Sequence, residues 1–347
     1  MSEPLLKVEC LRKEFPAGNS LFSRNKSGVK AVDGVSLEIQ EGECFGLVGE
    51  SGSGKSTLAR CILDLLTPTS GRVVFDGKTI FERSAAERQR VSLPSAEMLA
   101  LRRNMQIIFQ DPTASLDPRM SAGDIVAESL RKHRVVPAGE IEKTAGDYLE
   151  LCGISRSLAG RRPAEFSGGQ KQRIGIARSL ALRPRFIVAD EPISALDVSV
   201  QSQILNLMRE LRRQFSLTFL FISHDLSTVE YFCDRIGVLY LGALAETGTA
   251  ADITGNPLHP YTRALFSAAP RARPGEKRAR VELHGEIPSP IHAPSGCKFH
   301  TRCPHAETRC AHRAPVFEDS GGAHRVACHR WRELSRAAAE RNAGVPL

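Results

Sequence analysis

The first part of the chain carries short stretches in which apolar and polar positions alternate, a pattern typical of β-strands separated by turns. One stretch differs, because residues 55–66 have the pattern of a helix. Turn-forming residues interrupt the pattern at 67–71 and at Asp76-Gly77. This part of the sequence therefore predicts one helix at 55–66 and strands at 8–11, 35–39, 44–48 and 73–75.

The middle of the chain is dominated by helical signals. They extend from about 112 to 182, with breaks at Pro137 and Pro163, and a polar, helix-prone stretch precedes them at 82–104. Compact apolar runs then alternate with helical stretches, and this alternation indicates a parallel sheet with covering helices. We expect strands at 186–189, 218–222 and 235–240, and helices at 200–214 and 226–232.

The composition changes after Pro270. Residues 271–280 are charged, contain a Pro-Gly pair and are typical of a linker. Beyond them the chain is rich in Cys and His and cannot build a large core by itself. We therefore expect an α/β fold in two parts: a large domain at 1–268, with a helical subdomain at about 112–182, and a small Cys-rich C-terminal domain within an extension at 269–347.

Composition and charge narrow the classes of function. Hydrophobic residues make up 41% and charged residues 25% of the chain, which is ordinary for a globular protein. No apolar run approaches the roughly 18 residues of a membrane-spanning helix, and the N-terminus lacks a signal-peptide pattern, so we expect a cytosolic protein. Of the net charge of +8, most lies in residues 271–347, where 14 Lys and Arg stand against 8 Asp and Glu. Aromatic residues are too sparse there for a base-stacking surface, which favours a solvated surface over nucleic acid or anionic lipid.

A glycine-rich stretch fits the phosphate-binding pattern GxxxxGK[ST]. Glycines let consecutive backbone N–H groups face the phosphates, and the helix that follows adds partial positive charge. Lys55 supplies a point charge at the β- and γ-phosphates, and Ser56 places a hydroxyl on Mg²⁺. The predicted strand before the stretch and the predicted helix after it favour ATP with Mg²⁺ over a glycine-rich turn without a ligand. The residues assigned to the nucleotide are Gly49, Glu50, Ser51, Gly52, Ser53, Gly54, Lys55, Ser56 and Thr57.

Two adjacent carboxylates, Asp190 and Glu191, follow the apolar run at 186–189. Buried parallel strands have such runs, and ligands bind at their carboxyl ends. We expect Asp190 to hold Mg²⁺ and Glu191 to orient and deprotonate the attacking water. An acidic strand end that faces solvent is the alternative, and the phosphate loop in the same predicted sheet makes it the weaker one.

A second candidate anion site is the sequence Phe166-Ser167-Gly168-Gly169-Gln170. Ser167 can cap a helix while Gly168 and Gly169 leave N–H groups open to a phosphate, although in isolation the motif is only a capped turn. Lying between the phosphate loop and the acidic strand, it resembles the LSGGQ signature of ABC ATPases, with Phe at the first position. The resemblance implies that this loop contacts the γ-phosphate of ATP bound to a second ATPase subunit.

The same resemblance implies a RecA-like core, an antiparallel β subdomain and a helical subdomain, and it assigns further residues to the site. Gln110 matches the glutamine that reaches the Mg²⁺ and water region, so the implied Mg²⁺ ligands are Ser56, Gln110 and Asp190. His224 matches the histidine that contacts the γ-phosphate. The implied catalytic residues are therefore Glu191, His224 and Gln110.

Two residues matched by the resemblance have an ordinary structural alternative. Taken alone, His224 is as well explained as a structural histidine at a strand end. Phe15 lies where the family has an aromatic ring that stacks on adenine, and the alternative is a core side chain. Residues 194–197 resemble the loop that crosses the dimer interface in the family.

Longer stretches narrow the resemblance. The chain is similar to the ATP-binding subunits of dipeptide and oligopeptide importers over about 5–330, with Phe15 and Ala293 as minor departures. The stretches that carry this similarity are FSGGQKQRIGIARSL, DEPISALDVSVQ, NPLHPYTRALFSAAP, GEIPSPIHAPSGCKFHTRCP and RVACH.

This narrower resemblance implies an ATPase that energises the uptake of dipeptides, oligopeptides or a related solute such as a nickel chelate. The implied partners are a second, different ATPase subunit, two transmembrane permease subunits and an extracytoplasmic solute-binding protein. The implied location is peripheral, at the cytoplasmic face of the inner membrane. A non-transport ABC ATPase of DNA repair or translation, which would bind nucleic acid, is the alternative. The single phosphate loop, the single SGGQ and the importer-like C-terminal stretches favour transport, without a nucleic-acid partner.

Four of the nine cysteines crowd into 32 residues with the spacing C-x5-C-x6-C-x17-C. Thiolate sets of this size bind Fe–S clusters or Zn²⁺, although the C-x2-4-C pairs usual in zinc sites are missing. Disulfides are disfavoured in a reducing cytosol, and free thiols are the remaining alternative. Some members of the resembled family hold a [4Fe–4S] cluster at four such cysteines, which makes a cluster the preferred interpretation. The residues concerned are Cys297, Cys303, Cys310 and Cys328, and the other five cysteines are expected to be small core residues.

Overall fold

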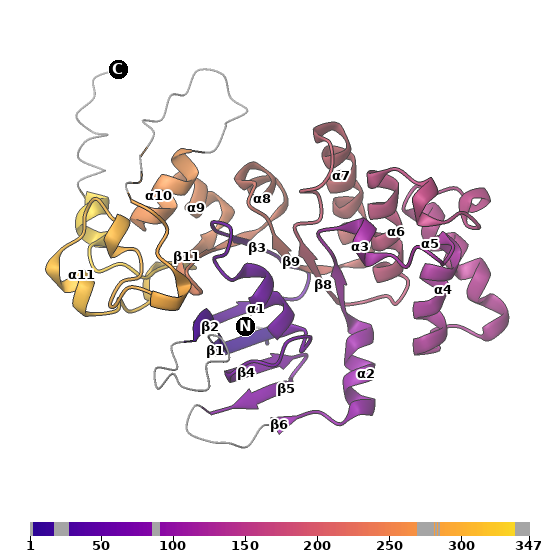
Figure 1. Ribbon diagram of the computed structural model, residues 1–347, viewed down its shortest axis with the longest axis horizontal. Coiled ribbons are helices and arrows are strands. Elements are labelled where there is room, and N and C mark those ends of the chain that lie inside the picture. The colour runs from indigo at the N-terminus through magenta and orange to yellow at the C-terminus, as the bar shows by residue number, and fades with distance from the viewer. Residues whose placement is uncertain are drawn as a thin grey trace.

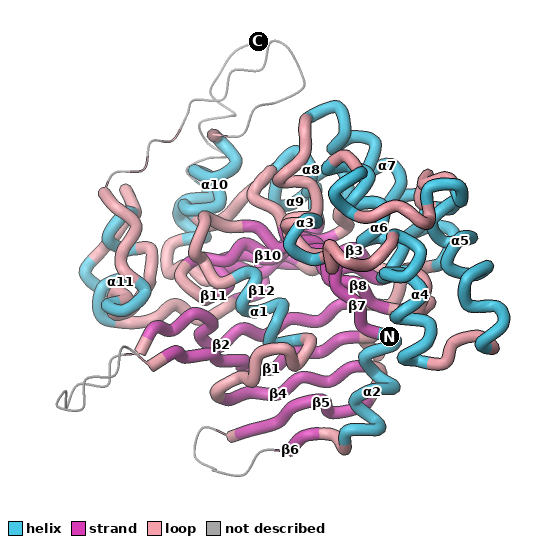
Figure 2. Tube along the Cα trace, turned by 45° about the vertical axis from the view of Figure 1, so that its right-hand side comes forward, coloured by secondary structure: helices cyan, strands magenta, loops and turns pink. Residues whose placement is uncertain are grey.

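The computed structural model describes residues 3–16, 28–84, 91–268, 281, 283 and 285–336 (Figure 1). In this part of the chain the strands form two sheets, one of five strands and one of eight. The linker predicted at 271–280 lies outside the described residues. In Figures 1 and 2 the helices α4 (Ala122–His133), α5 (Ile141–Leu151) and α6 (Gly168–Leu180) lie on the opposite side of the molecule from α11 (Thr308–His312).

The five-stranded sheet is antiparallel and contains three of the four strands predicted near the N-terminus, those at 8–11, 35–39 and 73–75. Its order is β2-β1-β4-β5-β6. The turn between β4 and β5 has positive φ at both Asp76 and Gly77, as a two-residue hairpin turn requires. The strands are β1 (Leu6–Phe15), β2 (Val29–Ile39), β4 (Ser70–Phe75), β5 (Lys78–Arg83) and β6 (Val91–Ser92).

Two expectations in this region were partly wrong. Among the described residues of the helix-prone stretch at 82–104, which leave out 85–90, the helix is α2 (Ser95–Asn104), and residues 82 and 83 continue β5 in pairing with β4. The helix predicted at 55–66 is α1 (Lys55–Ile62), which ends four residues early. The apolar spacing continues beyond Ile62, but Asp64 takes a left-handed conformation with φ of 50° and ends the helix.

The eight-stranded sheet holds the parallel strands of the fold, and four of its five parallel strands were predicted within a residue; β7 was not predicted. Its order is β12-β13-β11-β10-β3-β9-β8-β7, and the last five strands of that order are mutually parallel. Every residue of β3, β8 and β9 is buried, as expected of strands that helices cover on both faces. The parallel strands are β3 (Cys44–Val48), β7 (Met105–Ile108), β8 (Phe186–Asp190), β9 (Thr218–Ile222) and β10 (Arg235–Tyr240).

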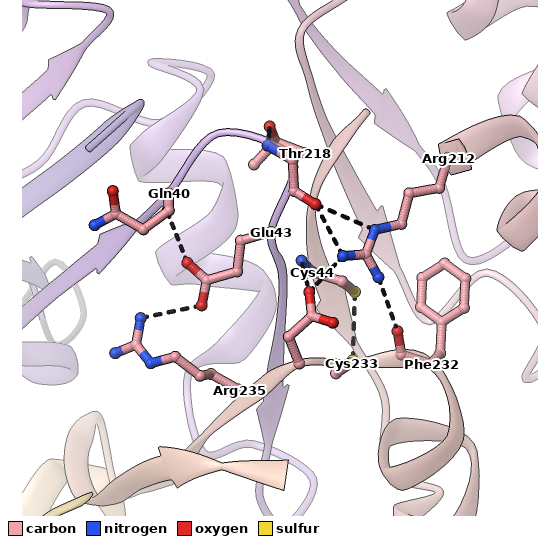
Figure 3. Close-up of polar contacts among 10 residues, drawn as sticks. Gln40, Glu43, Cys44, Arg212, Thr218, Phe232, Cys233 and Arg235 are labelled. Atoms are coloured by element: carbon pink, nitrogen blue, oxygen red, sulfur yellow. Dashed lines mark hydrogen bonds and ion pairs between the residues drawn. The ribbon is translucent and has the colours of Figure 1, made fainter. Parts of the chain in front are cut away.

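A polar network fixes the amino end of β3, opposite the end that leads into the phosphate loop (Figure 3). Arg212 on α7 (Val198–Phe215) pairs with Asp234, whose carboxylate also accepts the backbone N–H of Cys44 at 2.8 Å. Glu43 is buried and pairs with Arg235 at 3.0 Å. The contacts that Asp234 makes with Cys44 and that Arg235 makes with Glu43 come from a neighbouring segment, so they hold β3 in register where it begins.

The scattered cysteines follow the expectation with one exception. Cys44, Cys61, Cys152 and Cys233 are buried free thiols, and the sulfur atoms of Cys44 and Cys233 lie 3.5 Å apart. Cys10 is exposed instead, because a bulge in the pairing of β1 with its neighbours turns it out of the core.

The helical region predicted at 112–182 consists of α3 (Pro112–Ser115), α4, α5 and α6, with three short 3₁₀ turns between them. The breaks predicted at Pro137 and Pro163 both occur where such a turn begins. Apolar side chains from α4, α5 and α6 share one core with β8, β9 and α7. The region is therefore packed directly against the large sheet.

The chain after β10 adds three antiparallel strands to the large sheet. The strand β11 (Ala243–Thr249) pairs with β10, and the helices α9 (Ala250–Gly255) and α10 (Pro260–Ser267) follow. In the extension, β13 (His324–Val326) pairs with β11, and β12 (Glu318–Gly321) pairs with β13. These two strands, which the sequence pattern did not predict, join residues 318–326 to the sheet of the large domain. No helix in the described ranges is long and apolar enough to cross a membrane.

Candidate nucleotide-binding site

The phosphate loop lies between β3 and α1, and its first and last glycines are required by close backbone packing. A Cβ atom on Gly49 would lie 2.2 Å from the carbonyl oxygen of Leu239, and one on Gly54 would lie 2.1 Å from that of Ala31. Gly54 also has a φ of 103°, which other residues rarely adopt. The loop is therefore set tightly against β10 and β2.

The side chain of Lys55 is buried beneath this loop. Its Nζ donates to the carbonyl oxygens of Gly49 at 2.8 Å and Glu50 at 3.0 Å. Burial lowers the pKa of Lys55, and the carboxylates of Glu191, Asp190 and Glu50 oppose this shift. The ammonium group is thus held at the loop by weak neutral acceptors, which a phosphate oxygen can replace with a stronger charge-assisted bond.

Ser56 and Asp190 form the hydroxyl–carboxylate pair that the sequence analysis assigned to Mg²⁺. The Oγ of Ser56 donates to Oδ1 of Asp190 at 2.8 Å, which joins the start of α1 to the end of β8. Burial raises the pKa of Asp190, and the bond from Ser56 opposes the rise. Oxygen ligands of this kind suit Mg²⁺, and they stand directly beside the phosphate loop.

Glu191 follows β8 and contacts residues that follow two other parallel strands, β7 and β9. Its Oε2 lies 3.1 Å from Nε2 of Gln110, which follows β7, and 3.2 Å from Nδ1 of His224, which follows β9. The backbone of Glu191 is left-handed, with a φ of 48°, and its N–H donates to the carbonyl oxygen of Ile222 at 3.0 Å. Such a conformation costs on the order of 1 kcal/mol and is typical of functional sites.

A cavity of about 590 Å³ unites most of these residues and has the size of an ordinary ligand pocket. The predicted site residues that line it are Ser51, Gly52, Gly54, Lys55, Ser56, Thr57, Gln110, Glu191 and His224. Gly49, Glu50, Ser53 and Asp190 belong to the same loop and strand end without lining it. Six further residues line the cavity without having been predicted from the sequence: Val29, Lys30, Ala31, Leu241, Gly242 and Pro290.

Of the six lining residues that were not predicted, only Gly242 lies in a local sequence pattern that predicts structure. Gly242 has a φ of 77° and forms a tight turn between β10 and β11, so the pair Leu241-Gly242 after an apolar run predicts a turn. Pro290 comes from the extension, about 240 residues after the phosphate loop in the chain, and no local pattern connects the two.

Phe15 does not line the cavity. It is the last residue of β1 and pairs with Val29, which does line it. Its ring is partly exposed, and Nζ of Lys13 lies 5.0 Å from the ring centre. The neighbouring residues 17–27 lie outside the described chain, so the stacking role assigned to Phe15 stays a prediction.

The SGGQ loop lies apart from this cavity, at the start of α6. Ser167 caps the helix by accepting the N–H of Gln170 at 3.3 Å, and Oε1 of Gln170 accepts the N–H of Ser167 at 3.0 Å. Gly169 must be glycine because a Cβ atom would lie 2.4 Å from Val200 on α7. Ser167 and Gly168 are exposed, and the loop contributes no lining residue to the cavity. One chain therefore carries the two loops without bringing them together.

The four clustered cysteines converge, although they do not form a recognisable metal site. Cys297, Cys303, Cys310 and Cys328 line one cavity of about 20 Å³, which is on the order of a single water molecule. Burial raises the pKa of Cys297 to about 11 and that of Cys328 to about 12, so both are neutral thiols in this geometry. Among the described residues, no group of three or more His, Cys, Asp or Glu is arranged to hold a metal ion.

A loop with the phosphate-binding motif, the Ser56–Asp190 pair and the carboxylate of Glu191 meet at the ends of parallel strands, while the SGGQ loop begins a helix of the helical subdomain. This combination defines an ABC-type ATPase. Residues 32–194 match the family model described as ABC transporter, and residues 245–310 match the one described as oligopeptide/dipeptide transporter, C-terminal region.

Individual relatives and solved structures agree with this class. The oligopeptide transport ATP-binding protein AppF of Bacillus subtilis is 47% identical over 331 residues, which cover 95% of this chain and 98% of that protein. The dimeric, post-hydrolysis ATP-binding cassette MJ0796 bound to ADP and Pi matches with a TM-score of 0.59 and 29% identity, over 71% of this chain and 98% of that one. The cbiO1 protein of Clostridium perfringens, part of the cbiONQ transporter, matches with a TM-score of 0.60 and 29% identity, over 74% and 92%. The chain belongs to the ATP-binding, ATP-hydrolysing proteins of oligopeptide and dipeptide ABC transporters.

Proposed function

We propose that this chain drives import of dipeptides or oligopeptides by hydrolysing ATP at an interface with a second ATP-binding subunit. The observation that carries the proposal is the convergence of Gln110 and His224 on Glu191, beside the phosphate loop. A nucleotide-binding protein without turnover has no need of a carboxylate held in this way. The peptide cargo is inferred from the relatives, of which AppF is an oligopeptide transport protein.

In the proposed reaction, Lys55 and the N–H groups of its loop hold the β- and γ-phosphates. Ser56, Asp190 and Gln110 would hold Mg²⁺, which would supply positive charge beside these phosphates. Glu191 accepts a proton from the attacking water, and His224 stabilises the γ-phosphate. Positioning and electrostatics supply most of the catalysis, as in other phosphoryl transfers.

The site needs a second subunit because Ser167 and Gly168 are exposed and no residue of the Ser167-Gly168-Gly169 loop lines its own cavity. We propose that each subunit closes the other's ATP with this loop, in a heterodimer of two different ATP-binding chains. The complex also contains two transmembrane permease subunits and an extracytoplasmic solute-binding protein. The chain works at the cytoplasmic face of the membrane, with residues 1–268 as the ATPase domain and 269–347 as its extension.

Reconstitution tests this function. The chain, co-expressed with the permease and ATPase subunits encoded beside it, is placed in proteoliposomes with the binding protein. Peptide should stimulate ATP hydrolysis and be taken up, because the binding protein signals a loaded state to the ATPases. Hydrolysis that ignores peptide, together with tight, salt-sensitive binding of DNA or RNA, would favour the non-transport class instead.

We propose a [4Fe–4S] cluster as the occupant of the cysteine cavity, with Zn²⁺ as the alternative. Support comes from the chemistry of the donors: four thiols line one enclosed space, and metal binding would convert them to thiolates. The side chains would have to move apart, because the cavity is too small for a cluster as it stands. When bound, the group would cross-link the extension.

Anaerobic purification tests this assignment. We expect iron and acid-labile sulfide in the protein, with visible charge-transfer absorption. Cys303→Ser should remove most of the iron, whereas the matched change of a buried thiol outside the cavity, Cys152→Ser, should not. Zinc without iron, or iron content that Cys303→Ser leaves unchanged, would exclude the cluster.

A further inference from the structure

The segment between the first two clustered cysteines reaches from the extension into the nucleotide site. Residues 297–303 read CKFHTRC, so Lys298, Phe299 and Arg302 lie between the thiols of Cys297 and Cys303. All three of these side chains are directed at the large domain, and none of them was assigned a role by its sequence pattern.

Arg302 holds the second residue of the phosphate loop. Its Nη1 donates to Oε1 and Oε2 of Glu50 at 3.1 and 2.9 Å, and lies 3.5 Å from the hydroxyl of Tyr240. The Arg302 side chain is only 8% exposed, so this ion pair is shielded from solvent on its cationic side. The N–H of Glu50 donates to the hydroxyl of Tyr261 at 3.0 Å, and its carbonyl oxygen accepts from Lys55. Glu50 is thus fixed through its side chain, its amide and its carbonyl.

Lys298 makes a second, parallel connection. Its Nζ donates to the carbonyl oxygen of Leu241 at 2.7 Å and pairs with Asp33 at 2.8 Å. Leu241 and Gly242 line the nucleotide cavity, and the N–H of Gly242 donates to the carbonyl oxygen of Ser53 in the phosphate loop at 2.8 Å. The same short segment therefore supports the loop from two sides.

Phe299 keeps the segment in place. It is buried, and its ring centre lies 5.3 Å from that of Tyr240 and 5.4 Å from that of Tyr261. Both tyrosines also contact the Arg302–Glu50 pair. A well-packed aromatic cluster has few alternative arrangements, so the guanidinium of Arg302 has a defined position opposite the phosphate loop.

We infer that Arg302 is a positioning residue for nucleotide binding, which acts through Glu50 to hold the phosphate loop in its binding conformation. Cys297 and Cys303, which bound its segment, also line the cysteine cavity. The inference rests on the proposed role of this loop in binding ATP. When the phosphate loop is already ordered, less of the binding energy of the nucleotide is used to order it. Loss of the Arg302–Glu50 contact should therefore weaken nucleotide affinity more than it slows the chemical step.

The test measures binding of a fluorescent ADP analogue to the full-length chain, and steady-state ATP hydrolysis in its complex with the second ATP-binding subunit. Arg302→Gln should weaken nucleotide binding about tenfold, within the usual range of coupling between sites, and raise KM by a similar factor while kcat changes by less than about twofold. Arg302→Lys keeps the charge and should recover part of the affinity. The matched control is Arg332→Gln, because Arg332 is an exposed arginine of the same extension that pairs with Glu318 at 2.6 Å. This control should bind nucleotide like the wild type.

A double-mutant cycle identifies the route. Glu50→Gln and Arg302→Gln should be strongly non-additive in nucleotide affinity, because each removes the same ion pair. Additive effects, or unchanged nucleotide affinity in Arg302→Gln, would overturn the inference. Should Arg302→Gln fail to fold, the cycle is run with Arg302→Lys, which retains the cation but not the shared geometry. A wild-type complex with the second ATP-binding subunit that binds nucleotide without hydrolysing it would contradict the proposed function and leave this binding test intact.

Discussion

Glu191→Gln is expected to retain nucleotide binding and to lower steady-state ATP hydrolysis by about a hundredfold or more, the usual contribution of a general base. The amide has the shape of the carboxylate and can still meet Gln110 and His224, but it cannot take a proton from water. Binding should persist because Lys55, Ser56 and the loop N–H groups are untouched. With hydrolysis blocked, ATP should accumulate in the closed dimer.

The measurement combines three readouts on the assembled complex: nucleotide affinity, phosphate release and the dimer fraction by size-exclusion chromatography with ATP. Glu210→Gln is the matched control, since Glu210 is an exposed glutamate on α7. Turnover that survives Glu191→Gln would remove this residue from the role of base. Loss of nucleotide binding together with turnover would show that the carboxylate holds the site together instead of performing the reaction.

The parts of the site that the sequence predicted are those in which local chemistry dictates local structure. The glycines of the phosphate loop were predicted from the GxxxxGK[ST] spacing alone, although the carbonyl oxygens that leave no room for a Cβ atom at Gly49 and Gly54 belong to β10 and β2. The strands β3, β9 and β10 were predicted with correct bounds because each is a short apolar run between turn signals. The pairing of Ser56 with Asp190 follows once both strand ends are known to share an edge of the sheet.

The parts that escaped prediction depend on contacts between distant segments. The strands β12 and β13 are only four and three residues long, and they exist because β11 offers an edge to pair with. Arg302 and Glu50 are 252 positions apart, and neither carries a motif that points to the other. The crowding of cysteines predicted that their side chains would meet. What they bind depends on distances of a few tenths of an ångström, which composition and spacing do not encode.

The second large expected effect is on ATP hydrolysis and comes from a substitution in the SGGQ loop. In the assembled transporter, Ser167→Arg should lower hydrolysis by about a hundredfold or more at the ATP site on the partner subunit's phosphate loop, because a phosphate-facing donor is replaced by a bulky side chain at the dimer interface. Nucleotide binding to the isolated chain should be unchanged, since Ser167 does not line its own cavity. The change also removes a helix cap, which costs roughly 1 kcal/mol of stability.

Ser155→Arg controls for that loss, because Ser155 is another exposed serine of the helical subdomain that caps a short turn. If the loop acts in trans, Ser167→Arg and Ser155→Arg should lower the thermal midpoint alike, while only Ser167→Arg stops hydrolysis at the partner's ATP site. Mixing a Ser167→Arg subunit with a wild-type partner should disable the ATP site on the partner's phosphate loop and spare the one on its own. Wild-type hydrolysis in this mixed complex, or loss of nucleotide from the mutated chain's own loop, would mean that the two loops do not meet across the interface.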